Sequence, residues 1–493
     1  MLANDTSDQR FLEKVHPSRP VRPDIPDRYD FLVIGGGASG IAAAREAKRL
    51  GAARIALVEA GILGGDRLAY GAVPMLALLG GARRAARAAD LPEKRKIFAE
   101  TLEMMRRKRN RLADACSAKR LAEEGIDVFF GYASFESPKS VSVRLGNERV
   151  ELAFSKALVA TGARPAVPAI PGFSELKLKN LGDMFDLERL PDRLAVLGAG
   201  AHGVEIAQAF ARFGCETTLI DKADRVLPQA EERASELLSR QLEDDGVKLR
   251  LRAGVIEARQ RADGVSLRIE RFGNEEEILV DHLLVLAGRT PNVDGLSLDL
   301  CGAETSSGSV LIDEHLQTTA PGIYACGDVV ALARSPQTAE AQATLAVRNA
   351  LKFGREKISD LVVPWVAFTE PEIAHVGRTK AELERAGVEF RAVSVSFTEQ
   401  DRGLLEEEDG EMELALGPKG EILGASVVHP FAGELLAEIS LAMARGLKLQ
   451  ELAGIHRPFP TRIRALGELA EAERRHQQSA GPGAKLRALL RKG

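Results

Sequence analysis

Cysteine is scarce in this chain, and the few cysteines lie far apart. The 493 residues include four, at positions 116, 215, 301 and 326. Their spacing matches neither a metal site nor a redox-active cysteine pair. We therefore expect no metal centre, and we take a reducing cytoplasm as the default location.

Long apolar runs and a strong net charge are also missing. No run approaches the roughly 18–20 apolar residues needed to span a bilayer, so we expect no membrane contact. The first residues, MLANDTSDQRFLEKVHPSRP, contain acidic side chains and no apolar core, which argues against a secretory signal. The net charge of −4 gives no reason to expect nucleic acid as a partner.

The composition is that of an ordinary soluble protein, with 45% hydrophobic and 28% charged residues. Its length predicts two to four domains and a sizeable buried core. Residues 1–27 are polar and rich in proline, and we expect an extended arm, with a mobile tail as the alternative. The basic stretch 476–493 ends in AKLRALLRKG, which favours a disordered tail over a lipid-binding helix.

A dinucleotide-binding pattern begins near the N-terminus. The apolar strand Phe31–Ile34 leads into Gly35-x-Gly37-x-x-Gly40 and an alanine-rich helix, and a second strand ends at Glu59. The glycines allow a tight turn and let backbone N–H groups approach a pyrophosphate at a helix N-terminus. The acidic residue accepts hydrogen bonds from the adenosine ribose. The complete strand–loop–helix–strand–Glu order is much more specific than the glycines alone.

A second pattern of the same kind opens at Arg193, and two patterns imply two dinucleotides. Its strand, Leu194–Leu197, runs into GAGAHGVE and a helix. The candidate binding residues are Gly198, Gly200, Gly203, Glu205 and Asp221, with Gly288 after a later strand. An acidic residue at the position of Asp221 favours NADH over NADPH, because a 2′-phosphate would meet a like charge. The nearby Lys222 and Arg225 leave NADPH open.

Between the two patterns lie a helical, charged stretch at 81–125 and a small β-meander from residue 126 to residue 165. The arginine-rich cluster at 106–111 is interpreted as a solvated helix face rather than an anion site. After the second pattern comes TTAPGIYACGDVV, with Asp328 at the end of a strand and a helix expected from about Pro336.

The stretch Leu63–Leu79, LGGDRLAYGAVPMLALL, is similar to the redox-active disulfide helix of the pyridine nucleotide–disulfide oxidoreductases, approximately GGTCLNxGCxPSKAL. That family includes lipoamide dehydrogenase, glutathione reductase and mercuric reductase. The two cysteine positions hold Arg67 and Ala72, and the lysine position beside the flavin holds Leu76. A thiolate is the species that exchanges with disulfides. Arginine and alanine cannot carry out this chemistry.

The resemblance covers about residues 29–470 and implies an α/β fold with FAD as the first dinucleotide. It implies two Rossmann-like domains, for FAD and NAD(P), and a C-terminal α/β dimerisation domain of a homodimer. The expected ranges are 28–180 and 301–360 for FAD, 181–300 for NAD(P) and 361–475 for the interface. In the family, the chain crosses under the flavin at the place of Thr161 and Gly162. The aspartate at the place of Asp328 binds the ribityl–pyrophosphate region.

The family's acid–base motif near the C-terminus, H-P-T-x-x-E, is also altered. Aligned on Pro460 and Thr461, its histidine position holds Phe459 and its glutamate position holds Arg464. Neither side chain takes a proton from a thiol at neutral pH. His456 would need a shift of three residues, and a structural role is favoured for it.

These features predict an FAD-dependent NAD(P)H oxidoreductase with a non-disulfide acceptor, such as a quinone, O2 or a small organic molecule. Arg67, Ala72 and the partner's Phe459 would form the acceptor face. One alternative is a catalytically retired flavoprotein that serves as a binding or assembly subunit. Another is a sulfur-handling enzyme that brings two of the other cysteines together in space.

Overall fold

The computed structural model describes residues 6–330, 336–352 and 354–480, so the prediction for the terminal AKLRALLRKG lies outside the described residues. Two compact units are present. The first holds the residues up to Gly198 together with Ile206–Ile220 and Ala253–Leu361. The second holds Ala199–Glu205, Asp221–Arg252 and the residues from Val362 on. No helix in the described ranges is long and apolar enough to cross a membrane.

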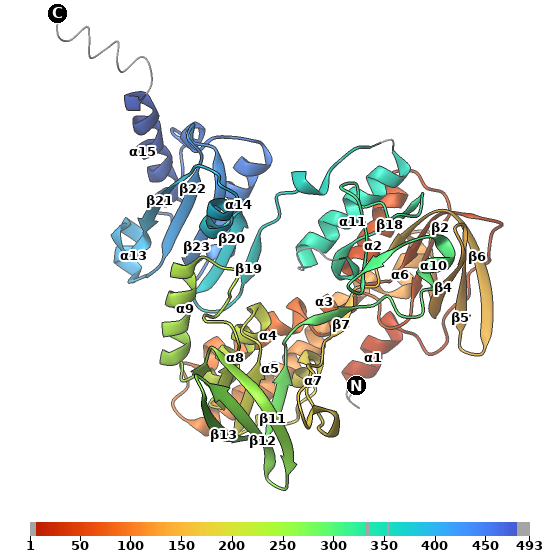
Figure 1. The fold of residues 1–493 in the computed structure, drawn as a ribbon, viewed down its shortest axis with the longest axis horizontal. Coiled ribbons are helices and arrows are strands. Elements are labelled where there is room, and N and C mark those ends of the chain that lie inside the picture. The colour runs from red at the N-terminus through yellow and green to blue at the C-terminus, as the bar shows by residue number, and fades with distance from the viewer. Residues whose placement is uncertain (1–5, 331–335, 353, 481–493) are drawn as a thin grey trace, which may run out of the picture. The chain divides into compact units, whose positions relative to one another are not determined.

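A seven-stranded sheet forms the centre of the first unit (Figure 1). Its parallel strands are β1 (Tyr29–Ile34), β2 (Ile55–Glu59), β3 (Ile126–Phe130), β6 (Glu148–Val159) and β18 (Ile323–Ala325). The antiparallel strands β4 (Tyr132–Ser137) and β5 (Ser140–Leu145) extend it from β6. Along β1, Phe31 and Val33 enter one hydrophobic core, whereas Leu32 and Ile34 enter a second on the opposite face. A strand buried on both faces is typical of a parallel sheet.

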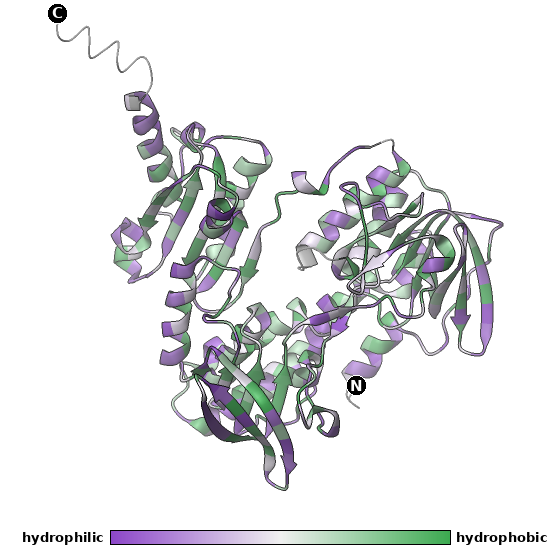
Figure 2. Cartoon of the chain, viewed as in Figure 1, coloured by the Kyte–Doolittle hydropathy of each residue, from purple (hydrophilic) through white to green (hydrophobic). Residues whose placement is uncertain are grey.

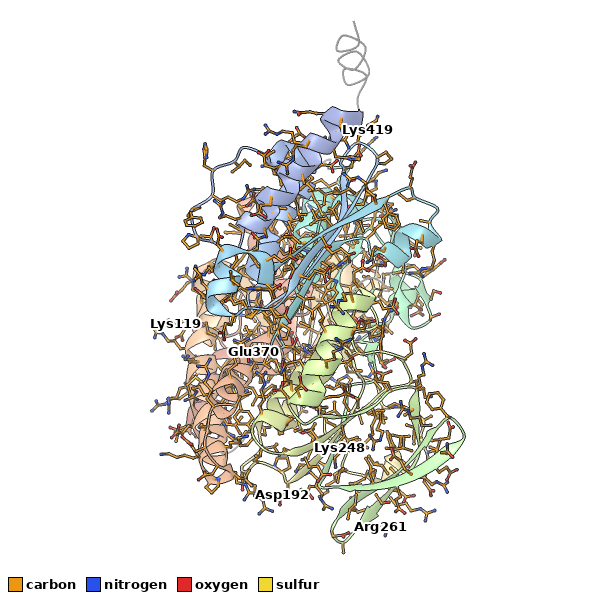
Figure 3. All side chains as sticks on the ribbon, turned by 90° about the vertical axis from the view of Figure 1, so that its left-hand side faces the viewer. Lys119, Asp192, Lys248, Arg261, Glu370 and Lys419 are labelled. Carbon is orange, nitrogen blue, oxygen red and sulfur yellow. The ribbon has the colours of Figure 1, made fainter. Side chains whose placement is uncertain are left out.

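A smaller sheet contains the strand that leads into the second glycine pattern. Three of its four strands are parallel and belong to the first unit: β8 (Arg193–Leu197) lies between β9 (Glu216–Ile220) and β14 (His282–Val285). Beside it is an antiparallel sheet of β11 (Ala253–Arg261), β12 (Gly264–Arg271) and β13 (Asn274–Val280). Arg261, at the β11–β12 turn, is labelled in Figure 3.

Helices pack around these sheets in the first unit. They are α1 (Thr6–Val15), α2 (Ala38–Arg49), α3 (Gly65–Ala69), α4 (Ala72–Ala85), α5 (Leu91–Leu112), α6 (Ala118–Glu123), α7 (Leu181–Phe185), α10 (Leu298–Cys301) and α11 (Pro336–Leu351), and α8 (Ala201–Arg212) has residues in both units. The short strands are β7 (Ala163–Pro165), β15 (Arg289–Pro291), β16 (Thr305–Ser306) and β17 (Ser309–Val310).

The second unit is built on a five-stranded antiparallel sheet. Its order is β19 (Trp365–Ala367), β20 (Glu372–Gly377), β23 (Ile422–His429), β22 (Glu411–Leu416) and β21 (Arg391–Ser396). The accompanying elements are α9 (Glu232–Asp244), β10 (Lys248–Arg250), α12 (Lys380–Arg385), α13 (Asp401–Glu406), α14 (Ala432–Ala444) and α15 (Arg464–Ala480). The predicted fold class, two Rossmann-like domains followed by an α/β domain, is confirmed.

The N-terminal segment corrects one prediction, because residues 6–15 form the helix α1 rather than an extended arm. Phe11 and Val15 stand four residues apart, and both are fully buried in the core that also contains Leu63 and Ala69. Figure 2 shows mixed purple and green along α1, as expected of a helix with one buried and one exposed face.

The arginine cluster at 106–111 is a second correction. Arg109 is only 1% exposed and pairs with Asp8 of α1, whose side chain is equally buried. Arg106 also approaches Asp8, with 3.8 Å between its Nε and Oδ2. The helix α5 therefore has a buried charged stripe, and only its other face is solvated.

Candidate dinucleotide and acceptor sites

The first glycine loop has no room for a side chain at Gly35 or Gly40, but it has open space at Gly37. A Cβ on Gly35 (φ +109°) would lie 2.3 Å from the Ala160 carbonyl oxygen, and one on Gly40 would lie 1.8 Å from the Gly35 carbonyl oxygen. Around Gly37 the nearest heavy atom to such a Cβ is 4.0 Å away. The loop thus brings β1 and α2 together and leaves open space at Gly37, where a pyrophosphate can approach the backbone.

The groups beside this loop suit the rest of an adenine dinucleotide. In the described part of the chain no side chain caps α2 at Gly37, so its N-terminal N–H groups face outward for an anion. The Glu59 carboxylate accepts hydrogen bonds from the N–H groups of Gly36 and Gly61, each at 2.5 Å. Burial raises the pKa of Glu59, and the two N–H groups act in the opposite direction. This carboxylate is held at the end of β2, where ribose hydroxyls can donate to it.

Thr161 and Gly162 are hydrogen-bonded to the segment around β15 (Arg289–Pro291), which follows the second dinucleotide pattern. The Thr161 hydroxyl donates to the Asn292 carbonyl oxygen (2.7 Å), and the Asn292 side chain donates back to the Thr161 carbonyl oxygen (3.0 Å). The Asn292 N–H donates to the Gly162 carbonyl oxygen (2.9 Å), and β15 pairs with β7. Gly288, with φ +126°, precedes this ladder. The structure therefore brings Thr161, Gly162 and Gly288 into one small β-structure.

Asp328 lies in an ionic network that the sequence alone did not reveal. The Arg289 Nε is 3.0 Å from the Asp328 carboxylate, and the Arg289 Nη2 is 2.5 Å from Asp66 of α3. The Gly327 N–H donates to the Gln342 side chain of α11 (2.8 Å), and a Cβ on Gly327 would lie 3.5 Å from Ser39 Oγ. Asp328 is thus held beside α2 and α3, as a ligand to a flavin dinucleotide needs to be.

The second glycine pattern has a similar geometry. Gly198 has φ +118°, and a Cβ there would lie 2.6 Å from the Leu286 carbonyl oxygen. Around Gly200 no described heavy atom lies within 4 Å of such a Cβ, and Gly203 lies in the first turn of α8. The residues thus fit a second close approach of a ligand to the backbone.

Asp221 is fixed beside this second loop. Its carboxylate accepts hydrogen bonds from the Ala199 N–H (2.5 Å) and the Ala223 N–H (2.7 Å). The Arg225 guanidinium instead donates to the Pro228 carbonyl oxygen (3.2 Å). The Asp221 carboxylate is therefore fixed at the loop, and the Arg225 side chain is bonded to the backbone three residues later.

Glu205 is buried and bridges two segments of the second unit. Its carboxylate accepts from the Phe368 N–H at 2.8 Å and lies 3.1 Å from the His202 Nδ1. These contacts hold the carboxylate in place, so Glu205 has a structural role in addition to the predicted one in the nicotinamide site.

The predicted acceptor residues of the first unit lie on adjoining helices. Arg67 of α3 forms an ion pair with Glu340 of α11, and the two side chains are 45% and 37% exposed. Ala72 is the first residue of α4, and Leu76, one turn later, is 45% exposed. Glu340 was not singled out from the sequence, because nothing in the spacing between residues 67 and 340 indicates the contact. Arg67 thus places a partly exposed cation, paired with Glu340, on α3.

The altered acid–base motif keeps its two residues together in space. The Arg464 guanidinium lies 5.1 Å from the centroid of the Phe459 ring, and Phe459 is 67% exposed. A cation–π pair thus occupies the place of an acid–base pair. His456 is exposed nearby.

The four cysteines form no disulfide, and all are buried. Burial raises the pKa of each thiol, to about 12 for Cys215 and Cys326. A thiol with a raised pKa is a poor nucleophile and a poor redox partner. No group of three or more metal-binding side chains occurs in the described ranges. The hypothesis of a sulfur-handling site made from other cysteines therefore has no support in the geometry.

Comparison with known proteins gives the same assignment along almost the whole chain. The profile described as "Pyridine nucleotide-disulphide oxidoreductase" matches residues 29–350, and that of its dimerisation domain matches residues 363–470. The chain is 33% identical to a dihydrolipoyl dehydrogenase of Bacillus subtilis, with 90% of this chain and 96% of that protein covered. It is 31% identical to a mercuric reductase of Staphylococcus aureus, with 89% and 81% covered.

A solved structure has the same fold. The Cu(II) complex of the HOCl-induced flavoprotein disulfide reductase RclA from Escherichia coli superimposes with a TM-score of 0.80 at 25% identity, covering 91% of this chain and 100% of that one. Members of the family use FAD and NAD(P)H, for which the residues described above provide two fitting cradles. The chain belongs to the pyridine nucleotide–disulfide oxidoreductase family.

Proposed function

We propose that the protein is an FAD-dependent NAD(P)H oxidoreductase that delivers electrons to a non-disulfide acceptor, such as a quinone, O2 or a small organic molecule. The observation that carries the proposal is that the two cysteines are missing while the residues for dinucleotide binding are present. Both glycine loops have open space for a ligand, at Gly37 and Gly200, whereas the positions that align with the family's cysteines hold Arg67 and Ala72. The RclA structure is that of a disulfide reductase, and disulfide exchange needs a thiolate that Arg67 and Ala72 cannot supply.

The residues of the two cradles do the binding and orienting. FAD would be held by the α2 N-terminus, Glu59, the Thr161–Gly162 crossing and Asp328. When bound, the flavin accepts hydride from the nicotinamide and passes the electrons on, which is chemistry that the cofactor itself supplies. Asp221 supports NADH over NADPH, because its carboxylate stands beside the glycine loop where a 2′-phosphate would meet a like charge.

The acceptor side is proposed to lie at Arg67, Ala72 and Leu76, completed by the partner subunit's Phe459. The ion pair of Arg67 with Glu340 is half exposed, so it contributes only about 0–1 kcal/mol to stability. An anionic group on the acceptor can therefore replace Glu340 as the partner of Arg67. Ala72 and Leu76 leave an apolar surface against which a planar ring can rest.

A homodimer and a cytoplasmic location complete the proposal. The dimerisation-domain match over residues 363–470 supports pairing with a second copy. Large exposed apolar side chains of this unit, Leu404, Leu405, Phe431 and Phe459, support it too. Four cysteines without a disulfide are usual in a reducing compartment.

The two half-reactions test the proposal separately. Flavin reduction by NADH should stay near the wild-type rate in Arg67→Ala and Phe459→Ala. Reoxidation by quinones should change at least several-fold in both. Arg111→Ala, an exposed arginine on α5, is the matched control and should change neither rate. Unchanged reoxidation in both acceptor-face variants would show that the acceptor does not use this face.

The alternative of a catalytically retired binding subunit makes a different prediction for the wild type. In that case NADH would leave the flavin oxidised under anaerobic conditions. The fixed position of Asp221 beside an open glycine loop favours the enzyme, because a scaffold has little need of an intact nicotinamide pocket.

A further inference from the structure

The N-terminal helix α1 lies outside the residues that the family profile matches, which begin at residue 29. Its contacts converge on one place, the segment from Gly61 to Ala69 that leads into and forms α3. The Val15 carbonyl oxygen accepts a hydrogen bond from the Leu63 N–H (3.0 Å), and the His16 Nδ1 bonds with the Gly61 carbonyl oxygen. The segment that leads into α3 is therefore held by the last residue of α1 and the residue after it.

The C-terminal residue of α3, Ala69, is connected to α1 through the Arg109 side chain. One guanidinium nitrogen, Nη1, donates to the Ala69 carbonyl oxygen (3.1 Å), and the other, Nη2, lies 2.5 Å from the Asp8 carboxylate. The guanidinium also lies over the Phe11 ring, 4.8 Å from its centroid. Both charged side chains are only 1% exposed.

Because Asp8 and Arg109 are buried, their ion pair and the bond from Arg109 to the Ala69 carbonyl oxygen depend on each other. A buried charge that loses its counter-ion is strongly unfavourable, so removal of Asp8 destabilises the buried position of Arg109. Movement of Arg109 would also release the Ala69 carbonyl oxygen. The docking of α1 and the position of α3 are thus parts of one arrangement.

Relatives that have the disulfide possess a covalent link between the positions of Arg67 and Ala72, that is, between α3 and the start of α4. Here that link is absent, and α3 is a five-residue helix that begins at Gly65 and follows Gly64, both of which have positive φ. Such a segment has little rigidity of its own.

We propose that α1 is a positioning element that replaces the lost disulfide, holding α3 in place through Asp8 and Arg109. The inference rests on the proposed function only in taking α3 and α4 as the acceptor face. Asp8 and Arg109 are positioning residues, since Arg109 bonds to the backbone of α3, Asp8 holds Arg109, and neither touches the acceptor itself.

Hydrogen exchange on the FAD-bound full chain tests this without any activity measurement. In Asp8→Asn, amides of residues 63–71 should exchange at least tenfold faster, while those of β1, β2 and β6 should keep their protection. Arg22→Ala is the matched control, because Arg22 lies in the same N-terminal segment but its ion pair is with Glu148 of β6. It should leave residues 63–71 unchanged.

A rescue variant distinguishes positioning from general stability. Adding Arg67→Cys and Ala72→Cys to Asp8→Asn, then oxidising the pair, should restore slow exchange at residues 63–71. Unchanged exchange in Asp8→Asn, an equal increase throughout the first unit, or oxidation without rescue would each overturn the proposal. Failure of electron transfer in the wild type would leave these exchange results intact, so the two proposals fail separately.

Discussion

Asp328 has a defined environment that explains why it should govern flavin binding. Its carboxylate is fixed by Arg289, beside a glycine whose N–H is held by Gln342. Asp328→Ala should therefore yield largely apoprotein, which the ratio of flavin to protein absorbance measures. Asp294→Ala, at a surface pair with Arg164, is the control and should purify with full flavin. Full flavin in Asp328→Ala would show that the motif is wrongly assigned, whereas a lost circular dichroism signal would point to misfolding instead.

Asp221 should set the choice of nicotinamide. Its carboxylate, held by the Ala199 and Ala223 N–H groups, repels a 2′-phosphate, so the wild type should prefer NADH. Asp221→Arg should shift the ratio of the specificity constants for NADH and NADPH at least tenfold towards NADPH. Asp224→Arg, at an exposed neighbouring position, should shift it little. A wild type that favours NADPH tenfold would assign the choice to Lys222 and Arg225.

Single residues were predictable from the sequence where a motif constrains the backbone, as at Gly35 and Gly40. They were not predictable where a long-range partner decides. Arg109 looked like one more solvated arginine, because its counter-ion, Asp8, lies in a different helix. Arg67 likewise acquired Glu340 as a partner from α11, which no local pattern indicates.

At the scale of elements, the strands next to the glycine loops matched the prediction closely, since an apolar run that ends in a glycine turn has few other interpretations. The helix α1 was missed because prolines 17, 20, 23 and 26 dominate the composition of the first 27 residues. The signal was nevertheless present before them. Phe11 and Val15 repeat at i and i+4, which is the spacing of a buried helix face.

The five-stranded sheet of the second unit should be sensitive to acid. Burial lowers the pKa of His375 and of His429, although Glu408 acts in the opposite direction at His429 and Arg462 in the same one. The unfolded chain therefore binds more protons than the folded one as the pH falls through about 6.5, and stability is lost below that pH. The loss is at most about 1.4 kcal/mol per pH unit for each histidine.

Urea unfolding followed by Trp365 fluorescence measures this dependence, because Trp365 is the single tryptophan and its ring lies 5.9 Å from that of His375. His429→Gln should flatten the dependence between pH 7.5 and 5.5. His315→Gln, at a half-buried position of the first unit, should leave it unchanged. Equal slopes in the wild type and in His429→Gln would contradict the assignment.

At the scale of the whole molecule, the proposed acceptor face is complete only in a homodimer, because Phe459 is supplied by the second copy. Light scattering should therefore give twice the 53.1 kDa chain mass at micromolar concentration. Replacing the exposed Leu404 and Leu405 of α13 by serine should shift the equilibrium towards monomer. A monomeric wild type would remove Phe459 from the acceptor face.

The order of the motifs along the chain was enough to predict the fold class, since two dinucleotide patterns followed by a strand-rich segment match one family architecture. In the proposed function, the destination of the electrons depends instead on the absence of two sulfur atoms, at positions 67 and 72. The missing cysteines are visible in the sequence, but the electron acceptor that replaces a disulfide has to be identified by measuring the reaction.

An anaerobic titration of the purified flavoprotein with NADH, completed with dithionite, tests this central claim most directly. The account predicts that NADH bleaches the flavin and that reduction ends at two electrons per FAD, without a long-wavelength thiolate-to-flavin charge-transfer band. Those two electrons are the full capacity of a flavin that has no disulfide beside it. Consumption of four electrons per FAD would show that another cysteine pair has taken over, and a flavin that NADH leaves oxidised would show that the protein is not an NADH oxidoreductase.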